Sequence, residues 1–121
     1  MTDSYRNRYN AIDKNLTARQ HAYWSNKISR IQPNLTINYV LFKDAVVEGK
    51  TESGGLSLMG FDVEACVARI TKLEQELDKC LNKLGWNENQ LKYISTWKQN
   101  RELRTEINRD LYEWQDIHGG E

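Results

Sequence analysis

The sequence is poor in proline, cysteine and histidine: it has one proline, two cysteines and two histidines among 121 residues. With so little proline and serine, extended disorder is not indicated. No apolar run approaches the roughly 18 residues of a membrane helix, and there is no charged-then-apolar leader. We therefore expect neither a membrane span nor a signal peptide. Two cysteines without a secretion signal predict a reduced, cytoplasmic protein.

The formal net charge is zero, so the field of the whole molecule favours neither nucleic acid nor a membrane. The charges are unevenly distributed, however. Residues 1–32 carry six basic and two acidic side chains, whereas residues 33–65 carry two basic and five acidic ones. This pattern predicts either two oppositely charged faces that meet in the fold or a basic docking surface.

The strongest periodic pattern predicts a helix from about residue 62 to residue 84. Its apolar side chains alternate between spacings of three and four residues, which is a heptad seam. The seam consists of Val63, Cys66, Ile70, Leu73, Leu77, Cys80 and Leu84. Asp62 can cap the first turn, and Gly85 can adopt a left-handed conformation after the last. The charged side chains from Glu74 to Lys83 predict a solvated face with ion pairs within the helix.

A second long helix is predicted from about residue 88 to residue 116. Its broad apolar face contains Trp86, Tyr93, Trp97, Leu103, Ile107, Leu111, Trp114 and Ile117. A smaller apolar patch contains Leu91, Ile94 and Tyr112. The short connection around Gly85 predicts that the two helices form a long antiparallel helical hairpin.

The first 48 residues predict two or three shorter helices. Tyr5, Tyr9, Ile12 and Leu16 have the spacing of a short first helix. Thr17 and Gln20 can form a capping box for a helix that starts at Ala18 and ends near Ile31, before Pro33.

Residues 34–48 fit two structures. Their alternating apolar side chains favour a strand, whereas a second spacing of apolar side chains favours a helix that ends at Gly49. We favour the helix, because a lone strand would have no partner for its backbone groups.

The predicted fold class is therefore all-α, a small helical bundle in a single domain of residues 1–121. It comprises an N-terminal helical part (1–48), a glycine-rich segment (49–61) and the helical hairpin (62–118). Two interpretations of the glycine-rich segment remain open. It is either a hinge, with Leu58 or Phe61 closing the end of the bundle, or an exposed loop with Met59 as an adaptable contact.

No group of residues has the pattern of a catalytic or metal site. His21 and His118 are far apart, and neither has a cysteine or histidine at metal-ligand spacing. Cys66 and Cys80 lie on an apolar seam, which suppresses thiol reactivity. The sequence therefore predicts a protein without enzymatic activity, cofactor or metal.

The candidate residues for binding a protein are apolar or aromatic side chains outside the main seam. They are Leu56, Leu58, Met59, Trp114, Leu91, Ile94 and Tyr112. Among the tryptophans, Trp114 is the best interface candidate, because it is nearest the chain end and aromatic anchors are enriched in binding hot spots.

The alternative function is binding of nucleic acid through the basic, aromatic N-terminal third. Arginine and lysine can neutralise phosphates, and exposed rings can stack on bases. The candidate residues are Arg6, Arg8, Arg19, Trp24, Lys27 and Arg30. The competing interpretation is that the aromatic side chains cover the hairpin while the basic ones point to water.

The heptad seam also predicts self-association. Val67 and Leu81 widen the seam beyond what one facing helix usually covers, which favours a two-fold dimer built on the hairpins. Cys66 and Cys80 are two heptads apart. In a parallel dimer each would face its own copy, and in an antiparallel dimer Cys66 would face Cys80.

The segment "GGLSLMGFDVEACVARITKLEQEL" resembles the glycine-rich link and heptad helix of small phage transcriptional regulators. Those regulators end in a DNA-reading helix-turn-helix, whereas this chain ends in one long charged helix, so their activity does not transfer. From the sequence as a whole we expect a non-enzymatic intracellular regulator or inhibitor of phage type, which binds another protein and contacts no membrane.

Overall fold

A computed structural model describes residues 16–87, 91 and 95–118. The elements in chain order are helix α2 (Ala18–Phe42), π-helix η1 (Lys43–Val47), strands β1 (Glu52–Ser53) and β2 (Leu56–Ser57), and helices α3 (Val63–Leu84) and α5 (Ser95–His118). The described part of the chain is mostly helical, as the sequence predicts. The short first helix predicted around Tyr5 and Tyr9 lies outside the described residues.

Helix α2 begins at the predicted capping box. The Thr17 side chain accepts a hydrogen bond from the Gln20 backbone amide at 3.1 Å, and the Gln20 side chain accepts one from the Thr17 amide at 2.9 Å. These two bonds satisfy amides that the first turn leaves without helical partners.

The predicted helix end before Pro33 is wrong, because α2 continues through this residue to Phe42. Proline in a helix interior costs about 3 kcal/mol, since it removes one backbone hydrogen bond and its ring crowds the preceding turn. The continuation, however, buries Leu35, Tyr39 and Phe42. Each contributes about 1.5–3 kcal/mol on burial, which exceeds the cost of the proline. Residues 18–42 thus form one long helix, and residues 34–42 are helical rather than a strand.

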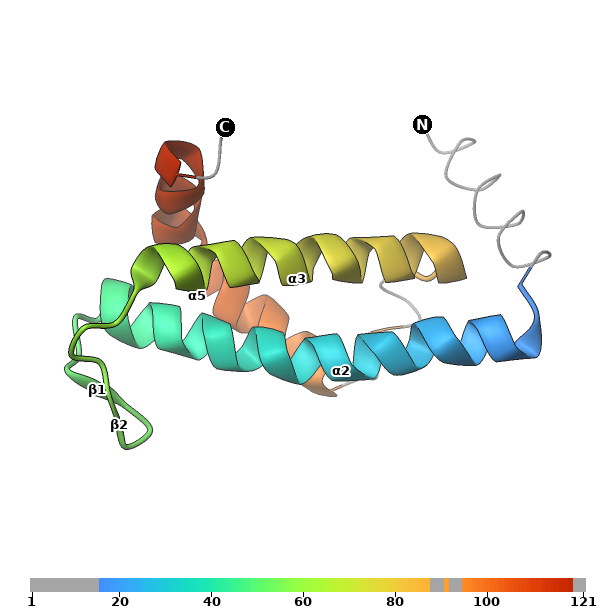
Figure 1. Cartoon of the computed structure of the whole chain (residues 1–121), viewed down its shortest axis with the longest axis horizontal. Coiled ribbons are helices and arrows are strands. Elements are labelled where there is room, and N and C mark those ends of the chain that lie inside the picture. Colours follow the sequence, from blue (N-terminus) through green and yellow to red (C-terminus); the bar gives the residue numbers. More distant parts are fainter. Residues whose placement is uncertain (1–15, 88–90, 92–94, 119–121) are drawn as a thin grey trace.

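Figure 1 shows α2 and α3 side by side and running in opposite directions, joined by the loop that carries β1 and β2. Residues 62–84 and 88–116 were expected to pair with each other. Instead, α3 makes its most extensive contacts with α2, and α5 crosses this pair. The physical reason is that α2, once continuous through Pro33, presents an apolar face with the same three-four spacing as the seam of α3.

The core lies between these three helices. The buried apolar side chains are Ile28, Ile31, Leu35, Tyr39 and Phe42 of α2, Cys66, Val67, Ile70, Cys80 and Leu84 of α3, and Ile107 and Leu111 of α5. The remaining seam residues of α3, including Leu73 and Leu77, are partly buried against the same core. The seam is therefore covered within one chain.

Both predicted ends of α3 are confirmed. The Asp62 side chain accepts a hydrogen bond from the Ala65 amide at 3.0 Å. Gly85 ends the helix with φ of 68°, a conformation that glycine adopts without steric cost. Trp86 follows directly and packs partly buried against the core.

Candidate functional site

The glycine-rich segment forms a small β-hairpin rather than a loop without strands. β1 and β2 pair antiparallel, with Glu52 opposite Ser57 and Ser53 opposite Leu56. Gly54 and Gly55 make the two-residue turn, with φ of +54° and +88°. A turn with two successive positive φ angles matches the twist of the strands and favours glycine at both positions.

The hairpin is fastened to the π-helix that ends α2. The Ser53 hydroxyl donates a hydrogen bond to the Asp44 carboxylate at 2.6 Å, and Ser53 is buried. The Lys50 amide donates to the Asp44 carbonyl at 2.8 Å, and the Leu58 amide donates to the Thr51 carbonyl at 2.8 Å. The two bonds to Asp44 hold the hairpin against η1, and the bond between Leu58 and Thr51 closes the base of the hairpin.

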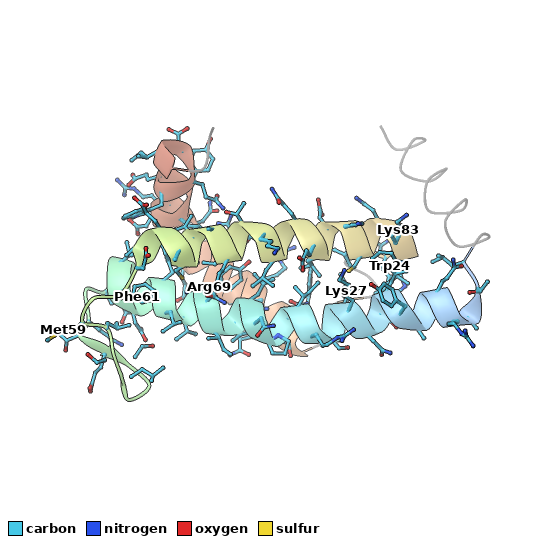
Figure 2. The ribbon with its side chains drawn as sticks, in the orientation of Figure 1. Trp24, Lys27, Met59, Phe61, Arg69 and Lys83 are labelled. Carbon is cyan, nitrogen blue, oxygen red and sulfur yellow. The ribbon has the colours of Figure 1, made fainter. Side chains whose placement is uncertain are left out.

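Two of the three predicted binding residues in this segment face solvent. Leu56 is 66% exposed and Met59 is 92% exposed, whereas Leu58 is buried. Figure 2 shows Met59 at the left edge of the loop, where it points away from the helices, with Phe61 closer to α3. Leu58 therefore has the inward position expected for a hinge residue, and Leu56 and Met59 have the outward positions expected for a binding loop.

The surroundings of the hairpin are acidic. Glu48 forms an ion pair with Lys50 at 2.9 Å, which lowers the pKa of Glu48 and raises that of Lys50, mainly through their direct hydrogen bond. Glu52, in β1, and Asp62, at the start of α3, are exposed. Across residues 48–64, four carboxylates therefore accompany one lysine.

A basic and aromatic cluster lies at the other end of the α2–α3 pair (Figure 2). The ammonium groups of Lys27, Lys79 and Lys83 lie 5.5, 5.9 and 5.8 Å from the centre of the Trp24 ring system. Tyr23 contacts Trp24 edge to face, with ring centres 5.0 Å apart. Cations over an aromatic face are attracted by its quadrupole.

The sequence identified only part of this cluster. Trp24 and Lys27 were nucleic-acid candidates, but Lys79 and Lys83 were expected to form ion pairs within their own helix. In the described residues neither lysine forms an ion pair. Glu74 instead accepts hydrogen bonds from Arg104 of α5 at 2.7 Å and from the Tyr39 hydroxyl of α2 at 2.5 Å. Helical spacing shows which partners a side chain has within its own helix, but it does not show that residues of α2 and α5 take Glu74 as their partner.

Hydrogen bonds between polar side chains also join α5 to α2. The Asn100 side-chain amide donates to the Gln32 carbonyl and to the Gln32 side-chain oxygen, both at 3.0 Å, and the Thr36 hydroxyl donates to the Asn100 oxygen at 2.5 Å.

A cavity of about 280 Å³ between the three helices is lined by Gln32, Tyr39, Glu74 and Trp97, among others. Burial, then the contact with Glu74, raises the pKa of Tyr39 far above its ordinary value.

Both cysteines are fully buried free thiols. The Cys66 thiol donates to the Asn38 carbonyl at 3.5 Å, so it faces α2. Burial raises the pKa of both thiols. In the structure α2 covers most of the seam from which the dimer was predicted, and self-association itself stays a prediction.

The remaining candidates are spread over the molecule. Leu91 is buried, Tyr112 is 67% exposed and Trp114 is partly buried, so these three residues do not share one exposed surface. Arg19 and Arg30 are exposed. Arg6, Arg8 and Ile94 lie outside the described residues.

Among the described residues, histidine, cysteine and acidic side chains form no group of three that could hold a metal ion. None of the helices, within that same part of the chain, has an apolar stretch long enough to cross a membrane. Comparison of the chain with protein family models, with curated protein sequences and with solved structures found no match. The assignment of a function therefore depends on the geometry described above.

Proposed function

We propose that this chain is a non-enzymatic intracellular regulator or inhibitor that binds another protein through two exposed apolar side chains of its hairpin segment. They are Leu56, next to the Gly54–Gly55 turn, and Met59, just after the hairpin, and we refer to the two side chains together as the tip of this segment. The observation that carries the proposal is that both side chains are exposed on a segment that is held to η1 by the hydrogen bond between the Ser53 and Asp44 side chains. A loop that is already ordered loses less conformational entropy on binding.

The charges near the tip indicate what the partner surface contains. Glu52 and Asp62 are exposed close to the tip in sequence, so a partner with an apolar pocket and a basic rim would be complementary in both shape and charge. Methionine suits such a pocket, because its unbranched side chain adapts to irregular apolar surfaces.

The test compares two double variants with the wild-type chain. Leu56→Ser/Met59→Ser removes the apolar tip. Ile37→Ser/Ile117→Ser is the matched control, because these residues are also apolar and exposed, at 57% and 67%, but lie on α2 and α5. Proteins from the native host that bind the immobilised wild type and the control, but not the tip variant, are candidate partners.

Affinity is then measured with the purified partner. Burial of each tip side chain contributes about 1.5–3 kcal/mol, so loss of both lowers affinity at least about a hundredfold. The control variant should bind within about threefold of the wild type. Sedimentation of the wild type alone tests whether the partner is a second copy. Equal binding by the tip variant and the wild type would refute the proposal.

A further inference from the structure

Helix α2 is a strongly basic element within a neutral protein. It carries Arg19, Lys27 and Arg30, and none of its 25 residues is acidic. Arg19 and Arg30 are exposed. The positive charge of this helix is therefore not cancelled along its own length.

Helix α3 adds two further cations at the same end of the molecule. Lys79 and Lys83 approach the Trp24 ring from α3 while Lys27 approaches it from α2. No ion pair in the described residues joins any of these three lysines to a carboxylate. Three like charges gathered around one ring repel each other, and a bound anion would relieve that repulsion.

Acidic side chains do not cancel this cluster. Glu76 lines a surface hollow with Tyr23, Lys27 and Arg30, and Asp78 lines another with Lys79 and Lys83. Arg19 and the four cations that line these hollows make five positive charges, against two carboxylates, so the excess is three positive charges. A polyanion would therefore be attracted to this end of the molecule.

The cluster also offers an aromatic platform. Tyr23 is 51% exposed, and Lys27 lies 5.8 Å from the centre of its ring. The hollow beside it has a volume of about 420 Å³ and includes the amide side chain of Asn34. An exposed ring next to lysines is the combination by which proteins hold single strands, because bases stack on the ring while cations contact phosphates.

We propose that this surface, formed by Arg19, Tyr23, Trp24, Lys27, Arg30, Lys79 and Lys83, binds single-stranded nucleic acid. The lysines and arginines contact successive phosphates, and one base stacks on Tyr23. A membrane surface fits less well, because binding to a bilayer needs several exposed apolar side chains on one face. At this end of the described chain Tyr23 is the large apolar side chain that is well exposed. The surface lies at the opposite end of the α2–α3 pair from the hairpin tip, so it is independent of the function proposed above.

The experiment measures fluorescence anisotropy of a labelled 20-nucleotide oligo(dT) between low and physiological salt. We expect binding at micromolar protein in low salt, which weakens as salt rises. Lys79→Gln/Lys83→Gln should lower the slope of log affinity against log salt by about 1.4, since each single-strand phosphate contact contributes about 0.7. Tyr23→Ala should lower affinity about fivefold or more through the lost stacking.

The control is Lys98→Gln/Arg109→Gln, which removes the same charge from exposed positions of α5. It should leave the slope unchanged, and circular dichroism should confirm that every variant folds. The absence of binding at tens of micromolar protein in low salt would refute the proposal. So would an equal loss in the control, tighter binding to a 20-base-pair duplex, or equal binding to a poly-glutamate peptide of matched charge.

Discussion

Replacement of Pro33 by alanine tests the most unexpected feature of the fold, the continuity of α2. Pro33 is exposed, so the substitution removes no buried contact. In a continuous helix the alanine amide can donate to the Ser29 carbonyl, which proline cannot use, and the crowding of the ring disappears. Pro33→Ala should therefore stabilise the protein.

The magnitude follows from the helix-interior difference between proline and alanine, which is about 3 kcal/mol in model helices. Part of that cost is already reduced here, because Ser29 is exposed and water can hydrate its carbonyl group. We expect a gain of about 1–3 kcal/mol in the free energy of unfolding. With a denaturant slope of about 2 kcal/mol per molar, the urea midpoint should rise by about 0.5–1.5 M.

The assay is urea unfolding followed by far-UV circular dichroism. Asn26→Ala is the control, because Asn26 is also exposed within α2 and its replacement should gain only about 0.5 kcal/mol from helix propensity. If Pro33→Ala left the midpoint unchanged or lowered it, α2 would not be continuous through residue 33. The helix end that the proline alone predicts would then be correct.

Two further predictions concern buried titratable groups. Tyr39→Phe should cost about 1 kcal/mol at neutral pH, since it removes the bond to Glu74. Folding raises the pKa of Tyr39. The contribution of Tyr39 to the free energy of unfolding is therefore fully present below pH 10, and it is lost as pH rises above about 10, where the unfolded tyrosine ionises. Thermal unfolding between pH 8 and 11 should therefore show a smaller loss in Tyr39→Phe, and no change in the loss in the exposed control Tyr112→Phe. Cys66 and Cys80 should react with a thiol reagent only as fast as the chain opens, because both are fully buried; rapid labelling, or disulfide-linked dimers under native conditions, would mean that α2 does not cover the seam.

Local signals in the sequence correctly predicted three helix ends. The capping box at Thr17, the cap at Asp62 and the left-handed Gly85 each depend on neighbouring residues alone. The seam of α3 was predictable for the same reason, since its spacing is a property of one helix. Pro33 was misjudged because its cost is local, whereas the burial of Leu35, Tyr39 and Phe42 that outweighs it depends on α3.

The choice of partner for the seam was beyond the sequence. Both α2 and the last helix carry apolar faces with a suitable period, and only their packing decides which one lies along α3. The basic surface was half identified for this reason: Trp24 and Lys27 are close in sequence, but Lys79 and Lys83 reach the ring only because α3 runs antiparallel to α2. The hairpin carried one usable signal, the pair Gly54–Gly55, but its strands lack the flanking apolar alternation that marks longer hairpins.

The direction in which the hairpin leaves α2 depends on the number of residues in the π-helix η1. Here the Glu48 amide donates to the carbonyl of Lys43, five residues earlier, at 2.9 Å, so the loop that each hydrogen bond closes contains one residue more than in an α-helix. Its first two residues point in different directions, with Lys43 paired to Glu106 of α5 and Asp44 bonded to Ser53 of the hairpin. Deleting one residue from 43–47 would restore α-helical winding and rotate the hairpin about the axis of α2 by about 100°. Insertions and deletions at this turn would thus change the direction of the hairpin while leaving the sequence of the hairpin intact.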